Sequence, residues 1–279
     1  MNKTEQCYQF FKEKGCSFVI HGGDMFDRHR IYNFDLIKGV RNVFKKFDIP
    51  TYFIMGQHDL QGYNLNTISS SNLGFIEDIS DGRLILIEKE INVDGYSIIA
   101  SHVNEDPVEK VNKVKKHDNP VICVCHALLI DKREAFGTIS ITHFKNPNVQ
   151  LVLSGDLHDG VKFQSCNNIQ FYNPGALART EKGTRMPKCG VLEWNEDKFE
   201  LEEFYPKCAD NKDIFFWDEV KTAKVEEDIK VNKDFIESFE KFHSESKDAF
   251  ELLLKIGKER NINQEVLELI KQYKDKNQN

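Results

Sequence analysis

Long hydrophobic runs are absent from this sequence. No stretch of its 279 residues approaches the roughly 20 consecutive apolar residues of a membrane-spanning helix. The N-terminus opens with polar residues, Asn2 to Gln6, and lacks the apolar core and small-residue cleavage site of a signal peptide. We therefore expect a cytoplasmic protein with no membrane contact.

Paired cysteine motifs are also absent. The chain has seven cysteines, an odd number, and no Cys-x-x-Cys pair. Free thiols of this kind fit a reducing cytosol. Cys123 and Cys125 alternate along an apolar run, which is ordinary for buried strand residues. We favour that interpretation over a metal role for the two thiols.

An excess of positive charge is the third feature that the sequence lacks. Its 38 Lys and Arg residues face 45 Asp and Glu residues, which leaves a net charge of −7 and a pI near 5.8. Nucleic-acid binders usually carry a basic face or stripe, which this balance does not indicate. A metal site can neutralise phosphate locally, however, so charge leaves nucleic-acid binding open.

What the sequence does have is an alternation of amphipathic segments and short apolar runs. Helical spacing of apolar residues predicts helices over residues 6–14, 34–47 and 108–116. Apolar runs predict strands over residues 17–20, 51–55, 84–87, 96–100, 121–124, 149–153 and 169–172. This alternation predicts a layered α/β domain.

The C-terminal part of the chain differs in pattern. Residues 189–205 predict a two-stranded hairpin, and charges dominate from about residue 207 to 230. Beyond that segment, groups such as Phe235, Phe239 and Phe242 predict short amphipathic helices. We divide the chain into a domain over residues 1–205, a linker over 206–230 and a helical segment over 231–279.

Polar clusters follow four of the predicted strands, where ligands bind in open α/β sheets. Each cluster alone is weak, because an Asp-containing turn or a lone histidine is usually structural. Four strand ends that all deliver Asp, His or amide side chains indicate a metal site, with ligands that suit Mn²⁺, Fe²⁺ or Zn²⁺. The clusters are residues 22–27 (Gly-Gly-Asp-Met-Phe-Asp), 56–59 (Gly-Gln-His-Asp), 125–126 (Cys-His) and 155–159 (Gly-Asp-Leu-His-Asp).

In order and spacing these clusters resemble the signature of the calcineurin-like metallophosphoesterases. More narrowly, they resemble the SbcD-type DNA exonuclease branch, which includes the nucleases of double-strand-break repair. Residues 23–27 match its Gly-Asp-x-x-Asp element in the Phe-containing form, and residues 173–177 resemble its Asn-Pro-Gly-Ser loop. The resemblance covers roughly residues 5–205. It implies a metallophosphoesterase-type β-sandwich flanked by helices, with a small C-terminal helical appendage.

The sequence departs from the family pattern in three places. The Asp-x-His element of the family's first strand is not found, because no aspartate precedes Asp24 and the only earlier histidine is His21. We expect a chain without that strand to be poorly soluble or to associate through unpaired edges. Gln57 stands where the family has a ligand asparagine, and Asp156 stands where it has a ligand histidine.

The resemblance assigns roles around two divalent metal ions, with Mn²⁺ as the expected metal. Asp24 bridges both ions, and Gln57, His126 and Asp156 complete one of them. His158 serves the other, which is left incomplete. Water activated between the ions attacks phosphorus in line.

Four further residues receive supporting roles from the same resemblance. His58 protonates the leaving oxygen or stabilises developing charge, and Asp59 holds the ring of that histidine. Asp27 supports a ligand without binding metal itself. Arg179 and Arg185, with Lys182 and Lys188, are candidates for contacts to substrate phosphate, although a solvated surface loop is an equally good interpretation.

The leading functional hypothesis is an SbcD-like DNA exonuclease or endonuclease subunit that acts on DNA ends in repair or recombination. Its expected partner is an SbcC-type ATPase that binds the C-terminal helices, which otherwise pack back as a cap; a homodimer is a further expectation. One alternative is a phosphoesterase for small molecules or phosphoproteins. Another is a non-catalytic interaction module, because the first metal-binding strand is missing. Metal identity, substrate, cleavage polarity and oligomeric state stay open at this point.

Overall fold

The computed structural model describes residues 2–131, 137–178 and 186–209. The predicted helices over 231–279 and most of the predicted linker lie outside the described residues, as do Arg179 and Arg185. In the described part of the chain, no helix is both long and apolar enough to cross a membrane.

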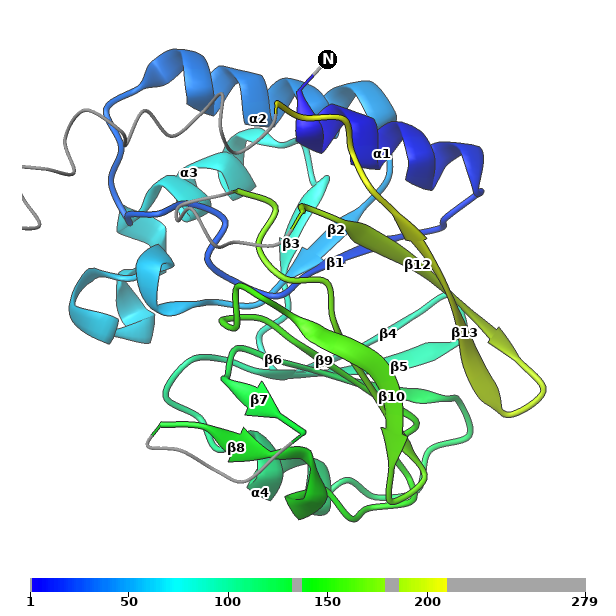
Figure 1. The fold of residues 1–279 in the computed structure, drawn as a ribbon. Helices are drawn as coiled ribbons and strands as arrows, with labels where there is room; N and C mark the ends of the chain where they lie inside the picture. The colour runs from blue at the N-terminus through cyan, green and yellow to red at the C-terminus, as the bar shows by residue number, and fades with distance from the viewer. Residues whose placement is uncertain (1, 132–136, 179–185, 210–279) are drawn as a thin grey trace, which may run out of the picture. The chain divides into compact units, whose positions relative to one another are not determined.

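Three helices cover a small parallel sheet in the N-terminal part of the chain (Figure 1). The sheet has the order β1-β2-β3, so β1 and β3 are its edges. Aromatic side chains of the helices, including Phe11, Phe44 and Phe47, form a core with Phe53 of the sheet. The elements are α1 (Lys3–Glu13), β1 (Val19–His21), α2 (Phe34–Phe47), β2 (Thr51–Phe53), α3 (Asn72–Ile79) and β3 (Leu84–Leu86).

Local sequence signals explain the limits of α2. The Asn33 side chain accepts a hydrogen bond from the Leu36 N–H and thereby caps the helix. The helix ends at Phe47, and the next residue, Asp48, adopts a left-handed conformation with φ 58°. The predicted helix over 34–47 is confirmed with both boundaries.

A six-stranded mixed sheet forms the second layer, with the order β10-β11-β9-β6-β5-β4. Its four central strands run parallel, and both edge strands run antiparallel to their neighbours. Every residue of β6 is buried, which agrees with the strand interpretation of Cys123 and Cys125. The strands are β4 (Glu90–Val93), β5 (Tyr96–Ser101), β6 (Val121–Cys125), β9 (Leu151–Ser154), β10 (Val161–Cys166) and β11 (Ile169–Asn173).

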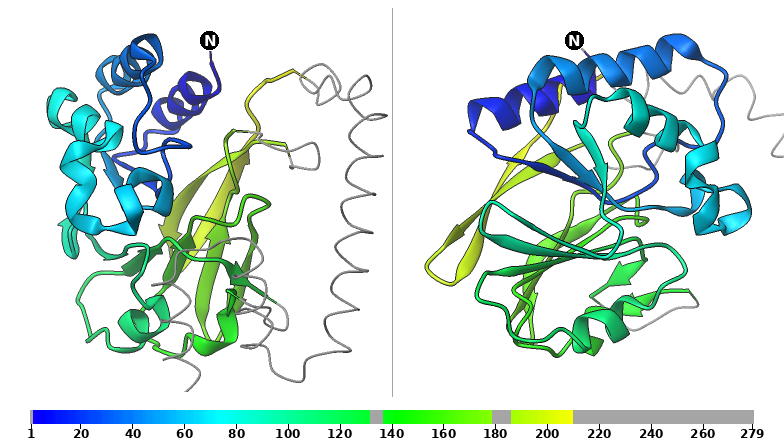
Figure 2. Two further views of the ribbon diagram at one scale, coloured as in Figure 1. Left: turned by 90° about the vertical axis from the view of Figure 1, so that its left-hand side faces the viewer. Right: turned by 180° about the vertical axis from the view of Figure 1, so that it is seen from behind.

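The two sheets face each other across a shared apolar core. Ile20 and Tyr52 of the small sheet pack in this core with Ile98, Ile122 and Leu151 of the large sheet. A separate core lies on the other face of the large sheet, beneath α4 (Pro107–Asn112). Figure 2 shows the helices α1, α2 and α3 on the outer side of the small sheet. The prediction of a layered α/β domain is confirmed.

The remaining elements are short. A hairpin of β12 (Cys189–Asn195) and β13 (Lys198–Phe204) agrees with the predicted hairpin over 189–205. The others are β7 (Leu129–Ile130), β8 (Ile139–Ser140), η1 (Gln57–Asp59), η2 (Gln61–Tyr63), η3 (Leu65–Ser70) and η4 (Ile141–His143). The helix predicted over 108–116 starts earlier and is shorter, because Asp106 caps it, Pro107 occupies its first position and it ends at Asn112.

Candidate metal site

Asp24 lies in the loop that follows β1, in a strained conformation with φ 51°. Gly23 before it has φ 90°, and a Cβ at that position would lie 2.5 Å from the His126 ring and 2.9 Å from the Gly56 nitrogen. The His58 backbone N–H donates to Asp24 Oδ1 at 2.7 Å. The loop therefore needs glycine at position 23 so that three segments meet at the Asp24 carboxylate.

The Asp59 carboxylate holds the loops that follow β1 and β2 together. It accepts hydrogen bonds from the backbone N–H groups of Asp24 at 2.8 Å, Met25 at 3.1 Å and Gly56 at 3.0 Å. Burial raises the pKa of Asp59 to about 6, with the Asp24 charge adding to the effect and the backbone donors opposing it. The expected contact between Asp59 and the ring of His58 stays a prediction, since the hydrogen bonds found for Asp59 run to the backbone.

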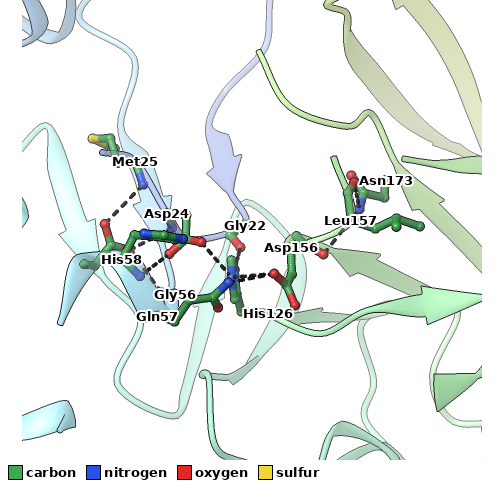
Figure 3. A network of polar contacts seen from close by, with 12 residues as sticks. Gly22, Asp24, Met25, Gly56, Gln57, His58, His126, Asp156, Leu157 and Asn173 are labelled. Atoms are coloured by element: carbon green, nitrogen blue, oxygen red, sulfur yellow. Dashed lines mark hydrogen bonds and ion pairs between the residues drawn. The ribbon is translucent and has the colours of Figure 1, made fainter. Parts of the chain in front are cut away.

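His126 follows β6 and is aimed at Asp24 from the large sheet. Its Nδ1 donates to the Gly22 carbonyl oxygen at 2.6 Å, which leaves Nε2 as the free ring nitrogen. That Nε2 lies 3.2 Å from Asp24 Oδ2 and 3.8 Å from Asp156 Oδ1 (Figure 3). The side chain is 1% exposed, and Nε2 makes no hydrogen bond within the described residues.

Asp156 completes the cluster from the loop after β9, and it too has a left-handed backbone, with φ 71°. One ligand atom each of Asp24, His126 and Asp156 lies within 4.8 Å of the others. The Gln57 amide donates to Asp156 Oδ1 at 2.7 Å, which places that amide at the cluster. Burial lowers the pKa of His126, but the nearby carboxylate of Asp24 outweighs it, and the net shift is upward.

The donor set fits a divalent metal. Two carboxylates converge on a buried imidazole nitrogen that has no hydrogen-bond partner, and mixed oxygen and nitrogen ligation suits transition metals. The hydrogen bond from Nδ1 to the Gly22 carbonyl orients the ring, as is usual for histidine ligands. Asp24, His126 and Asp156 form the metal-binding group of this protein.

The Asn-Pro-Gly segment supports this site rather than lining it. The Asn173 amide donates to the carbonyl oxygens of Gly155 at 3.3 Å and Leu157 at 3.2 Å, and its Oδ1 accepts from the Gly175 N–H at 2.7 Å. Asn173 is 2% exposed. The sequence pointed to this segment only through the family resemblance, because the contacts that hold the Gly155 loop depend on the pairing of β11 with β9.

Other predicted site residues lie outside the three-residue cluster. His158 is exposed, and Asp27 is exposed and pairs with Arg28 at 3.8 Å. The His58 side chain is also exposed, although its backbone binds Asp24. Lys188, a member of the predicted phosphate-binding stretch, pairs with Glu203. The roles assigned to these residues stay predictions.

The chain is similar to a known protein family and to solved structures. The model of the calcineurin-like phosphoesterase family matches residues 1–160. A solved structure of a Thermus thermophilus protein is similar, with a TM-score of 0.50, 13% identity, and coverage of 72% of this chain and 92% of that chain. A dimetal phosphatase of Danio rerio matches with a TM-score of 0.39 and 11% identity, over 62% of this chain and 76% of that one. A search of the curated proteins finds no match.

Proposed function

Because the chain belongs to the calcineurin-like phosphoesterase family, we propose that it is a DNA-cleaving phosphodiesterase of the SbcD type. Membership of this family establishes that the protein is a metal-dependent hydrolase of phosphoester bonds. The choice of DNA as the substrate, and of Mn²⁺ as the metal, is the proposal.

One observation supports the hydrolytic chemistry of the proposal: loops from both sheets bring Asp24, His126 and Asp156 to one point. His126 and Asp156 reach Asp24 from the ends of parallel strands. Both lie 102 or more residues after Asp24 in the sequence. These three side chains would hold a divalent metal ion, which would supply an activated water as nucleophile by lowering its pKa to roughly 7.

The residues around the metal-binding group orient its ligands and protonate the leaving oxygen. His126 is held in its ligand tautomer by the Gly22 carbonyl. The short backbone contact of His58 with Asp24 keeps the exposed imidazole beside the cluster, where it donates a proton to the leaving oxygen. Gln57 offers its amide oxygen as a further ligand. His158 is proposed for a second metal, for which an Asp-x-His strand would supply the remaining ligands.

The preference for DNA over a small phosphoester depends on the form of the motifs. The Phe-containing run over residues 23–27 and the Asn-Pro-Gly segment at 173–175 occur together in the expected order. The metal ligands themselves do not separate the two substrate classes, because both use the same cluster.

The test is Mn²⁺-dependent hydrolysis of bis-p-nitrophenyl phosphate and of a duplex DNA with a labelled end. We expect the wild type to cleave both, and His58→Ala to lose about 10²-fold or more, as for a general acid. Cleavage of the model ester without any cleavage of DNA would favour a small-molecule or phosphoprotein phosphoesterase. Inactivity on both would favour the non-catalytic module.

A second arm tests the two-metal arrangement. A version extended at its N-terminus by a strand that carries Asp-x-His is compared with the 279-residue chain. We expect two Mn²⁺ per chain and higher activity in the extended version. Equal activity with a single Mn²⁺ in both versions would contradict the two-metal proposal.

We also propose self-association. Phe34 is 67% exposed, Leu36 is 44% exposed and Phe75 is 48% exposed, on the neighbouring helices α2 and α3. Large exposed apolar side chains of this kind mark interaction surfaces. Light scattering should show a dimer that Phe34→Asp with Phe75→Asp converts to a monomer.

The proposed SbcC-type ATPase partner would bind residues 231–279, and co-purification with and without that segment tests it.

A further inference from the structure

His102 lies at a junction between the two sheets. It directly follows β5 of the large sheet and is 3% exposed. Its Nδ1 accepts a hydrogen bond from the Met55 N–H at 3.1 Å. The other ring nitrogen, Nε2, lies 3.1 Å from the Glu88 carbonyl oxygen. Because Nδ1 must accept, Nε2 carries the proton and donates to Glu88.

Met55 is clamped on both of its backbone groups. While its N–H binds His102, its carbonyl oxygen accepts from the Val103 N–H at 3.0 Å. The two preceding residues still follow the small sheet, since the Ile54 N–H donates to His21 and the Phe53 carbonyl accepts from Ile87. Met55 is thus the point at which the chain leaves the small sheet and becomes attached to the large one.

The clamped residue directly precedes the site loop. Gly56 follows Met55 and donates to Asp59, and the next two residues supply the Gln57 amide and the His58 N–H that contact the metal-binding group. A Cβ on Gly56 would lie 2.2 Å from Asp24 Oδ1, so this backbone passes very close to a metal ligand. A small displacement of Met55 therefore displaces the groups around Asp24.

The turn that carries His102 is itself held firmly. The His102 N–H donates to Glu105 Oε2 at 2.6 Å, and Lys110 Nζ binds the same carboxylate oxygen at 2.6 Å. Lys110 also donates to the Ala100 carbonyl at 2.8 Å. These contacts fix the imidazole relative to the end of β5, so that it serves as a rigid support for Met55.

We propose that His102 is a positioning residue of the phosphoesterase site. It acts through Met55 on the loop over residues 56–59 and contacts neither metal nor substrate. The inference rests on the proposed function in one respect only, namely that this loop belongs to the site. The sequence offered a signal, because a histidine lies two residues after the apolar run over 96–100, but no second motif residue accompanies it.

The test compares two substitutions of this residue. His102→Asn keeps an acceptor at the position of Nδ1 and loses only the contact to Glu88, whereas His102→Leu keeps bulk and loses both contacts. We expect the Mn²⁺ affinity of His102→Leu and its activity on bis-p-nitrophenyl phosphate each to fall about 10-fold or more, as for other residues that support ligands. The loss of activity should lie in kcat rather than in KM. His102→Asn should remain within about 3-fold of wild type.

Three readouts separate a positioning role from general destabilisation. Hydrogen exchange of the amides over residues 54–59 should be faster in His102→Leu than in His102→Asn, while amides of β6 stay protected. Mn²⁺ affinity, read by paramagnetic resonance, reports on the site even if the wild type hydrolyses neither substrate. His117→Leu is the matched control, since His117 lies near the edge strand β4, where it pairs with Glu90 at 3.6 Å, and should change none of these.

Either of two results would overturn the inference. One is wild-type Mn²⁺ affinity and loop exchange in a folded His102→Leu variant. The other is an equal loss in His102→Leu and His102→Asn that follows their melting temperatures, which would assign the residue a structural role alone. Inactivity of the wild type with the expected exchange pattern would refute the proposed function and leave the positioning role supported.

Discussion

The two sheets secure their site loops by different chemistry. In the small sheet, a buried carboxylate, Asp59, accepts three backbone N–H groups. In the large sheet, a buried neutral amide, Asn173, donates to two carbonyl oxygens and accepts one N–H. An ionised carboxylate can accept hydrogen bonds but cannot donate them, whereas an amide both donates and accepts. The first arrangement therefore depends on charge, and the second does not.

The metal-binding group lies where these two arrangements meet. Asp24 belongs to the loop held by Asp59, and Asp156 belongs to the loop held by Asn173. His126 reaches from the large sheet and binds the Gly22 carbonyl of the small one. The cluster thus connects two separately ordered loops, and a bound metal ion would strengthen that connection.

The largest expected effect comes from removing the shared ligand. Asp24→Asn should lower Mn²⁺-dependent hydrolysis of the model ester by about 10³-fold, because a charged ligand worth several kcal/mol is lost and each 1.4 kcal/mol is tenfold. Asp27→Asn is the matched control in the same motif and should stay near wild type, since Asp27 is exposed. Similar losses in both variants would make Asp27 a ligand as well.

Replacing the Asn173 amide, which holds the Gly155 loop, by a carboxylate should have the next largest effect. Asn173→Asp places a carboxylate against the carbonyl oxygens of Gly155 and Leu157 and removes both donated hydrogen bonds. We expect a loss of about 3 kcal/mol in the free energy of unfolding, measured in urea, because unpaired buried groups cost about 1–3 kcal/mol each. Asn195→Asp, at the exposed last residue of β12, is the control. A wild-type midpoint in Asn173→Asp would contradict the assigned support.

Crowding the contact between the loops should cost less. Gly56→Ala adds a Cβ that would lie 2.2 Å from Asp24 Oδ1, so the metal-free protein should lose about 1–3 kcal/mol of unfolding free energy. Gly39→Ala, within α2, meets no atom within 4 Å and should stabilise the protein by about 0.5–1 kcal/mol through helix propensity. Thermal melts measure the stability of both variants. A stabilised Gly56→Ala variant would show that the loops that carry Asp24 and Gly56 move apart freely.

The smallest effect is a pH dependence carried by His102. Burial lowers the pKa of His102 below its ordinary value of 6.5. The unfolded chain therefore takes up a proton first as pH falls through about 6.5, so acidification lowers the free energy of unfolding by at most about 1.4 kcal/mol per pH unit. Urea titrations between pH 7.5 and 5.5, without metal, should show a shallower dependence in His102→Asn. Identical slopes in the two proteins would exclude a lowered pKa.

Much of the site was readable from the sequence because each ligand directly follows an apolar run. Asp24, His126 and Asp156 were all predicted from such positions, and the structure brings them together. The same rule pointed to His158, which lies two residues beyond Asp156 in an exposed turn, and its role at a second metal stays a prediction. Strand β4 and helix α3 were missed, since β4 is an edge strand with alternating exposed residues and α3 has only eight residues.

The sequence by itself determined the alternating α/β order, the limits of α2 and the chemical types of the metal ligands, because these depend on local periodicity, capping and residue identity. Only the tertiary structure decided that Asp59 and Asn173 bind backbone groups of distant loops and that His102 clamps Met55. Those contacts join residues up to 47 positions apart through the packing of two sheets. Hydrogen bonds of that kind leave no periodic trace along the chain, so they become visible only when the strands are in place.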